Sequence, residues 1–257
     1  LKVNCIKFLM DGTLASGSDD KQIFIWNLTT FNYIVTINPA STDHILSLEE
    51  TPQGYLVSGS EKADGDIKLW HPKNGSLYFT LTNPYNNVGV NCLKMINSTH
   101  LASGLQKGSY SNGHIVIWNV LTKTQAGVIS QHTDNVNIFD LLSNGLLASG
   151  SNDRTVKIWN MTTFTKVQDF NPFFNSIFCL KHLTGSNIMA IGGADISLYF
   201  WNVPNTPFSA TFYNIAFNLI SSQPCQNMLY YKNRVLASAT NGKDILLINV
   251  TSELVMA

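Results

Sequence analysis

Leu147-Ala148-Ser149-Gly150-Ser151-Asn152-Asp153-Arg154-Thr155-Val156-Lys157-Ile158-Trp159-Asn160 is the clearest copy of a pattern that recurs along this chain of 257 residues. A run of small residues opens the pattern, polar turn residues follow, and an apolar run closes it. Self-similarity at a fixed period indicates a repeat architecture, in which neighbouring units bury one another's apolar faces. We therefore located every copy before interpreting any single residue.

The closing apolar run has six copies. They end at Trp26, Trp70, Trp118, Trp159, Trp201 and, with isoleucine in place of tryptophan, Ile248. The spacings between them are 44, 48, 41, 42 and 47 residues, and all five tryptophans of the chain stand at this position. Polar, Gly-rich stretches at 61–66 and 106–114 fall within the first and second of these spacings, and they are typical of loop insertions.

Two further markers precede each closing run. The small-residue run begins at Leu14, Leu56, Leu101, Leu147, Met189 and Leu236. A β-branched residue or cysteine lies 11 or 12 residues earlier, at Val3, Ile45, Val90, Val136, Ile177 and Cys225. Each unit thus holds four short runs rich in β-branched and aromatic residues, separated by turn residues. This pattern predicts strands joined by turns, without amphipathic helices.

The unit from His132 to Asn160 resembles the WD-repeat β-propeller family, and the weaker copies extend this resemblance over the whole chain. The resemblance implies an all-β fold, a β-propeller of four-stranded antiparallel blades with the first strand of each blade nearest a central channel. We expect a single domain over 1–257, with six blades at roughly 1–37, 38–82, 83–129, 130–170, 171–212 and 213–257. We also expect a fragment of a longer protein. Either six blades close the ring without strand exchange, or, as we favour, a seventh blade lies outside this chain.

His132, Ser149 and Asp153 are residue types that can form a hydrolytic triad. In the family that the chain resembles, these positions instead form a buried chain of hydrogen bonds that ends on the indole of the tryptophan, here Trp159. A nucleophile would need exposure and an oxyanion hole, and no Gly-x-Ser-x-Gly turn is present. We therefore expect a structural network in this blade and no enzymatic activity.

Composition argues against several other classes. Lys plus Arg and Asp plus Glu each number 16, so no basic excess favours nucleic acid, and no run of 18 apolar residues predicts a membrane span. No spacing of cysteine or histidine matches a metal site, and no glycine-rich loop matches a phosphate site. We expect neither cofactor nor metal.

The cysteines and the Asn-x-Ser/Thr matches give opposing indications of the compartment. Cys5, Cys92 and Cys179 share one repeat position in units that are not neighbours, and with Cys225 they are expected to be unbridged, as in the cytoplasm. Five glycosylation matches leave an extracellular adhesive propeller open; they start at Asn27, Asn74, Asn97, Asn160 and Asn249. Four of these follow the Trp-bearing run or its Ile equivalent, where asparagine also serves turn chemistry.

Without a catalytic constellation, we expect function to reside in partner binding. In the resembled family one rim of the funnel binds peptides and proteins. The matching positions here are Lys2, Asn4, Asp19, His44, Leu46, Asn91, Asn135, Asn137, Asn152, Ser176, Phe178 and Gln226. Most are neutral and Leu46 and Phe178 are apolar, which favours an interaction scaffold for a protein or peptide. The alternatives are a sensor attached to an effector domain outside this chain, the adhesive propeller and, as a minor one, a hydrolase.

Overall fold

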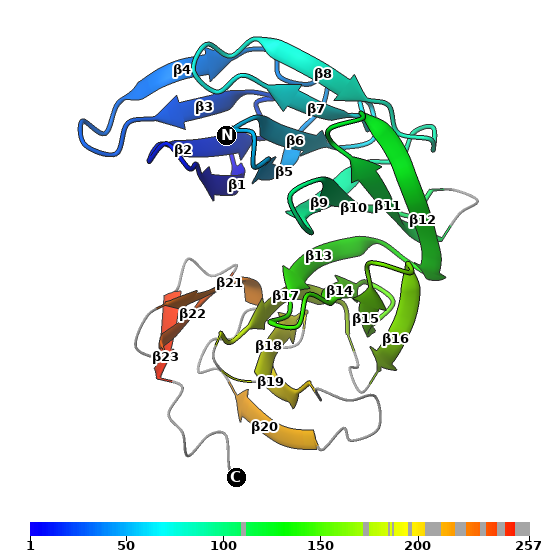
Figure 1. The fold of residues 1–257 in the computed structure, drawn as a ribbon. Coiled ribbons are helices and arrows are strands. Elements are labelled where there is room, and N and C mark those ends of the chain that lie inside the picture. Colours follow the sequence, from blue (N-terminus) through cyan, green and yellow to red (C-terminus); the bar gives the residue numbers. More distant parts are fainter. Residues whose placement is uncertain are drawn as a thin grey trace. The chain divides into compact units, whose positions relative to one another are not determined.

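The computed structural model describes residues 1–108, 112–171, 175–184, 186, 188–194, 197–203, 212–218, 225–231, 235–240 and 245–249. Every regular element in these ranges is a strand, and the strands form six antiparallel sheets (Figure 1), five of four strands and one of three. This confirms the predicted all-β class with four-stranded blades. The described ranges hold no helix that could cross a membrane.

The chain divides into two compact units, 1–136 and 137–257, which we describe separately. The predicted single domain with its six blade boundaries stays a prediction. The first unit holds three sheets, each in an order that follows the chain. Their strands are β1 (Val3–Phe8), β2 (Leu14–Ser18), β3 (Ile23–Trp26) and β4 (Tyr33–Ile37); β5 (Ile45–Glu50), β6 (Leu56–Ser60), β7 (Ile67–Trp70) and β8 (Leu77–Leu81); and β9 (Val90–Met95), β10 (His100–Leu105), β11 (Gly113–Asn119) and β12 (Thr124–His132).

The second unit holds the remaining three sheets. Their strands are β13 (Val136–Leu141), β14 (Leu147–Ser151), β15 (Val156–Asn160) and β16 (Thr165–Phe170); β17 (Ile177–His182), β18 (Ile188–Gly193), β19 (Ser197–Asn202) and β20 (Phe212–Asn218); and β21 (Cys225–Tyr231), β22 (Val235–Thr240) and β23 (Ile245–Asn249). The outer strand expected for the sixth blade, near residues 253–257, lies outside the described residues. We number the sheets as blades one to six along the chain.

The recurring glycine and the recurring β-branched marker pack against each other across neighbouring blades. A Cβ added to Gly59 in β6 would lie 2.7 Å from Cγ1 of Val90 in β9, and one added to Gly150 in β14 would lie 2.6 Å from Cγ2 of Ile177 in β17. No side chain larger than hydrogen fits at such a distance without displacement. In blades one, two and four the glycine thus packs against the β-branched marker of the next blade's first strand, which explains why the two markers recur together.

Ion pairs add a second link between the first strands of neighbouring blades. Lys7 in β1 pairs with Glu49 in β5 in the first unit. In the second unit Nζ of Lys181 in β17 lies 3.3 Å from Oδ2 of Asp140 in β13. All four residues are the fifth of their strand counted from the marker, so opposite charges stand at one repeat position in adjacent blades. This charge pattern favours the observed order of blades.

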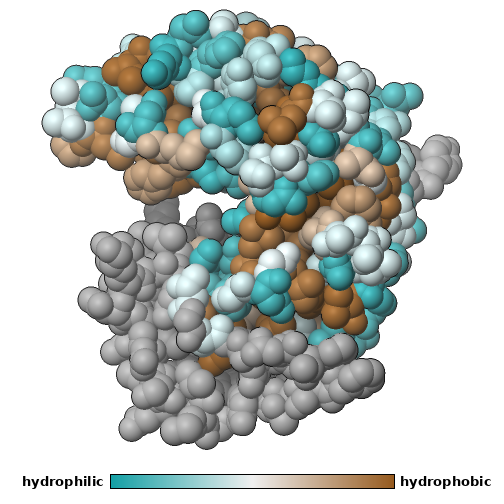
Figure 2. Space-filling view, in the orientation of Figure 1, coloured by the Kyte–Doolittle hydropathy of each residue, from teal (hydrophilic) through white to brown (hydrophobic). Residues whose placement is uncertain are grey.

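Polar and apolar side chains are intermingled over the surface of the first unit on the face that Figure 2 shows. The exposed large apolar residues of the first unit include Tyr33 and Ile34 in β4 and Leu77 in β8. Scattered apolar residues of this kind are normal on a protein surface and do not by themselves indicate a binding site.

Candidate functional site

The rim end of a blade is the end at which its first strand begins and its second strand finishes. There, the residue after the second strand donates its backbone N–H to the carbonyl of the residue before the first strand. The bonds are Asp19 to Lys2 at 3.0 Å, Glu61 to His44 at 3.0 Å, Gln106 to Gly89 at 2.8 Å and Ala194 to Ser176 at 2.9 Å. Glu61 and Gln106 therefore occupy the rim position that the loop insertions hid in the sequence. Their place directly after the small-residue run is the signal that identifies them.

In five of the six blades the residue after the marker is the extra residue of a β-bulge. In blade one the pairing of β1 with β2 passes from Val3 to Cys5 and skips Asn4, and in blade two it passes from Ile45 to Ser47. The register skips Asn91, Phe178 and Gln226 in the same way in blades three, five and six. A bulge redirects the side chain of its extra residue, so it explains why these positions belong to the rim end and not to the blade interior.

Asparagine at the bulge ties its blade to the next one. Nδ2 of Asn4 donates to Oδ1 of Asp19 at 2.7 Å and to the carbonyl of Ile45 in the next blade at 3.0 Å. In blade three, Nε2 of Gln106 donates to Oδ1 of Asn91 at 3.0 Å. The side chains of Asn4 and Asn91 are therefore held by contacts within the fold, which orders the rim end without a partner.

Leu46 and Phe178 stand at the bulge position without an amide. Both are half-buried, and neither can make the tie that asparagine makes. In blade one the amide of Asn4 pairs with Asp19, the residue after the second strand. The equivalent residue is Glu61 in blade two and Ala194 in blade five. Glu61 instead turns to His44, whose Nδ1 lies 3.0 Å from its Oε2. Blades two and five thus present an apolar side chain at the rim end.

His44 is the centre of an acidic group at the rim end of blades one and two. Besides Glu61, its Nδ1 lies 3.6 Å from Oδ1 of Asp19, and 42% of its side chain is exposed. Donor atoms of Asp43, His44 and Glu61 all lie within 4.8 Å of one another, a spacing that one divalent cation could bridge. Burial acts against the charge of Asp43, but the backbone N–H groups of Ala63 and His44 hold its pKa below the ordinary value. The carboxylate of Asp43 thus accepts two backbone N–H groups and His44 pairs with Glu61, so these side chains already have partners within the chain.

The remaining predicted rim residues have varied surroundings. Lys2 is exposed, and Ser176 is half-buried. Oδ1 of Asn135 accepts the backbone N–H of Lys107 at 2.6 Å, which holds the stretch after β10. Gln226 lies at the bulge of blade six, and its side chain lies outside the described residues.

The predicted structural network is partly visible. The indole of Trp159 donates to Oγ of Ser149 at 2.7 Å, and both side chains are fully buried. The same bond recurs in blades one, two and three at 2.8–2.9 Å. His132 is buried as well, so neither it nor Ser149 is placed to meet a substrate. The links of the network through His132 and Asp153 stay a prediction.

Blade five lacks the serine of this bond, because Ile191 stands in its place. The indole N–H of Trp201 is buried and has no hydrogen-bond partner among the described residues. A buried donor without a partner costs about 1–3 kcal/mol. The ring of Trp201 instead stacks on Phe170, with centroids 4.9 Å apart.

Two histidines that the sequence placed in loops or on the surface are buried. His114 belongs to β11 and not to the preceding insertion; its ring stacks on Tyr85 at 4.1 Å and its Nδ1 lies 2.7 Å from Oγ of Ser130. Burial lowers the pKa of His114. His182, the last residue of β17, is also buried, and burial lowers its pKa despite the opposing charge of Asp140. The insertion therefore ends two residues earlier than the predicted 106–114, because Gly113 starts the strand.

The described thiols and the turn asparagines behave as structural groups. Cys5, Cys92 and Cys179 are not joined in disulfides, and burial raises the pKa of Cys5 to about 12, which keeps it unreactive near neutral pH. Oδ1 of Asn27 accepts the backbone N–H groups of Thr29 and Thr30 at 2.8 and 3.1 Å. The turn chemistry that the sequence suggested for the glycosylation matches is therefore present. Glycosylation itself stays a prediction.

Comparisons with known proteins agree with this architecture. The family model "WD domain, G-beta repeat" matches residues 1–27 and 123–160. Fizzy-related 2 of Arabidopsis thaliana is 25% identical over 171 residues, which are 64% of this chain and 34% of that protein. Periodic tryptophan protein 2 of the same plant is 28% identical over 165 residues, 62% of this chain and 17% of that protein. The chain thus spans about a third or less of these relatives.

A solved structure extends the likeness to nearly all of the chain. The crystal structure of the RRP9 WD40 repeats superposes with a TM-score of 0.79 at 19% identity, over 99% of this chain and 78% of that one. At this identity the likeness concerns the fold alone. Together with the family model and the relatives, it supports a WD40 β-propeller fold for this chain.

Proposed function

This chain is a WD-repeat β-propeller, and we propose that it is a protein-interaction scaffold that binds a protein or peptide through the rim end of its blades. The observation that carries the proposal is that Leu46 and Phe178 stand at the bulge position, where Asn4 and Asn91 stand in other blades. The amide of Asn4, by contrast, is occupied within the fold. An apolar side chain at the same place makes no such contact, so its presence needs another reason.

The surroundings of Leu46 favour a partner with basic or hydrogen-bonding groups. His44 precedes it, and Asp19 and Glu61 lie beside His44 with side chains 29% and 37% exposed. A partner side chain packed on Leu46 would be bordered by these polar groups, an arrangement typical of an interface with an apolar centre and a polar rim. The bulge fixes the backbone at this point, which lowers the entropy lost on binding.

Asparagine substitutions test this proposal without threatening the fold, since other blades carry asparagine at the same position. Leu46→Asn and Phe178→Asn are used as baits in quantitative affinity purification beside the unchanged protein. Thr162→Ala, in the turn between β15 and β16 at the end of blade four opposite the rim end, is the control. We expect one or both asparagine variants to lose a partner that the control keeps. If all four baits recover the same partners in equal amounts, the rim end is not the binding surface.

A further inference from the structure

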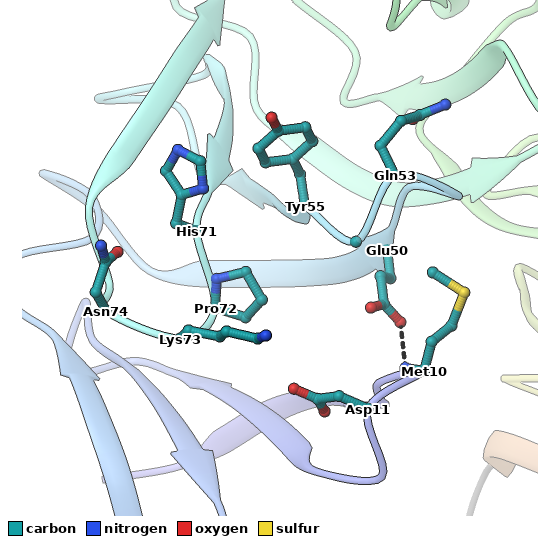
Figure 3. Close-up of a pocket in the computed structure, with 10 residues that line it drawn as sticks. Met10, Asp11, Glu50, Gln53, Tyr55, His71, Pro72, Lys73 and Asn74 are labelled. Atoms are coloured by element: carbon teal, nitrogen blue, oxygen red, sulfur yellow. Dashed lines mark hydrogen bonds between the residues drawn. The ribbon is translucent and has the colours of Figure 1, made fainter.

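A pocket of about 600 Å³ lies at the end of blades one and two that is opposite the rim end. It is enclosed by the turn between β1 and β2, the turn between β5 and β6, and the turn between β7 and β8. Figure 3 shows Asp11, Glu50, Tyr55, His71 and Lys73 around one space. The volume is in the range of pockets that hold a small ligand or a single side chain.

Two carboxylates form one wall of the pocket. Oδ1 of Asp11 accepts the N–H and the hydroxyl of Thr13 at 3.0 and 2.6 Å, and Oε2 of Glu50 accepts the N–H of Met10 at 2.7 Å. These bonds fix both groups, yet neither carboxylate has an ion-pair partner within the described ranges. Burial raises the pKa of Glu50 and the charge of Asp11 adds to this, whereas the N–H of Met10 and the charge of Lys7 oppose it.

An aromatic group forms another wall. The ring of Tyr55 stacks on Tyr78 with centroids 4.0 Å apart and an interplanar angle of 7°, and His71 meets Tyr55 edge-on at 5.1 Å. Nζ of Lys123 lies 4.3 Å from the centroid of Tyr78, so this pair of rings already accepts a cation. Tyr55 is thus held rigidly beside the carboxylates as a surface on which a flat cation can stack.

We propose that this pocket binds the guanidinium group of an arginine side chain presented by a peptide partner. The carboxylates of Asp11 and Glu50 can accept its N–H groups, and Tyr55 offers a face for the planar group. A lysine ammonium would gain the charge attraction and lose the planar fit. The site is separate from the rim end, so it extends the proposed scaffold function to a second surface.

Lys73 also lines the pocket, and its charge should affect the affinity for a charged guest. It has no ion pair in the described part of the chain and Figure 3 shows it directed toward the same space. Its positive charge opposes a cationic guest at the carboxylates. Lys73→Ala should therefore tighten binding of an arginine side chain, whereas it would weaken binding of an anionic guest.

Methyl NMR of the protein labelled at methionine methyl groups tests the proposal, because Met10 lines the pocket and is 65% exposed. The probes are acetyl-Gly-Arg-Gly-amide and its Lys and Glu counterparts. We expect the arginine peptide to shift the Met10 signal with a dissociation constant of about 1 mM, as befits a single side chain. The lysine peptide should bind more weakly, and the glutamate peptide should cause no shift.

Three variants decide the outcome. Asp11→Asn with Glu50→Gln keeps the acceptor oxygens that hold the turns and removes the charge, and should weaken binding at least tenfold; Lys73→Ala should tighten it about two- to fivefold. Asp169→Asn, which alters an exposed carboxylate in β16, should change nothing. No shift with any peptide, an equal shift in the doubly neutralised variant, or preferred binding of the glutamate peptide would each overturn the proposal.

Discussion

Nδ2 of Asn137 donates to Oδ1 of Asn152 at 2.7 Å and to the carbonyl of Ile177 at 2.8 Å, which joins blade four to blade five at the rim end. Asn4 makes the corresponding pair of bonds in the first unit. One side chain thus fixes the end of its own blade and the start of the next. The rim end is therefore rigid where asparagine is present and open to another use where it is not.

Asn137→Leu should lower the free energy of unfolding by about 1–3 kcal/mol, because it removes both bonds and leaves the carbonyl of Ile177 without this donor. The reverse exchange, Leu46→Asn, should leave stability unchanged or raise it slightly. Urea unfolding of both variants checks the pair. Equal destabilisation by the two exchanges would contradict the role given to the amide.

Gly59→Ala should destabilise the protein by about 1–3 kcal/mol, because its Cβ would overlap Val90 of the next blade. Val90→Ala alone should cost about 2–3 kcal/mol through the cavity it leaves. In the double variant the methyl group added at position 59 no longer overlaps the side chain at position 90. The destabilisation of the double variant should therefore be smaller than the sum of the two single destabilisations. Strict additivity in a double-mutant cycle would show that the glycine is not required by this contact.

Trp159→Phe should destabilise the protein more than Trp201→Phe, by about 1–2 kcal/mol. The first exchange removes a buried hydrogen bond to Ser149, whereas the second removes a buried N–H group that has no partner among the described residues. Both exchanges lose similar volume, so thermal unfolding of the two variants isolates the hydrogen bond. A larger loss for Trp201→Phe would be inconsistent with this assignment.

Stability should fall as the pH drops below about 6.5, the ordinary pKa of histidine. Burial lowers the pKa of His114 in the folded protein, so the unfolded chain takes up its proton first and acid favours unfolding. His114→Phe keeps a ring on Tyr85 and should flatten the profile of melting temperature between pH 7.5 and 5. Ser130→Ala, which keeps the titrating ring, should retain the slope. An unchanged slope in His114→Phe would exclude His114 as a source of it.

The sequence predicts the blades because three markers recur at nearly constant spacing, and each marker has a physical role that the structure makes visible. The glycine of the small-residue run and the β-branched marker fit one another across blades, as Gly59 and Val90 do. The tryptophan needs the serine of the same blade, as Trp159 needs Ser149. Such requirements within a repeat leave a strong periodic signal.

The rim end is less predictable because its chemistry depends on pairing between strands. Leu46 and Phe178 can be predicted as rim residues because each follows the β-branched marker of its unit by one residue. Only the register of the strands reveals that they occupy a bulge. The insertion after β6 hides Glu61 from any spacing rule, although it directly follows the small-residue run. The pocket between blades one and two is missed altogether, since it is formed by three turns that share no motif.

Site-specific photo-crosslinking tests the central claim most directly. A benzophenone amino acid is placed at position 46 or 178 at the rim end, and at position 144 or 162 in turns at the end of blade four opposite the rim end. The account predicts that a protein partner of the rim end crosslinks from position 46 or 178 and not from 144 or 162. Crosslinks to that partner from 144 or 162 alone, with none from 46 or 178, would contradict it.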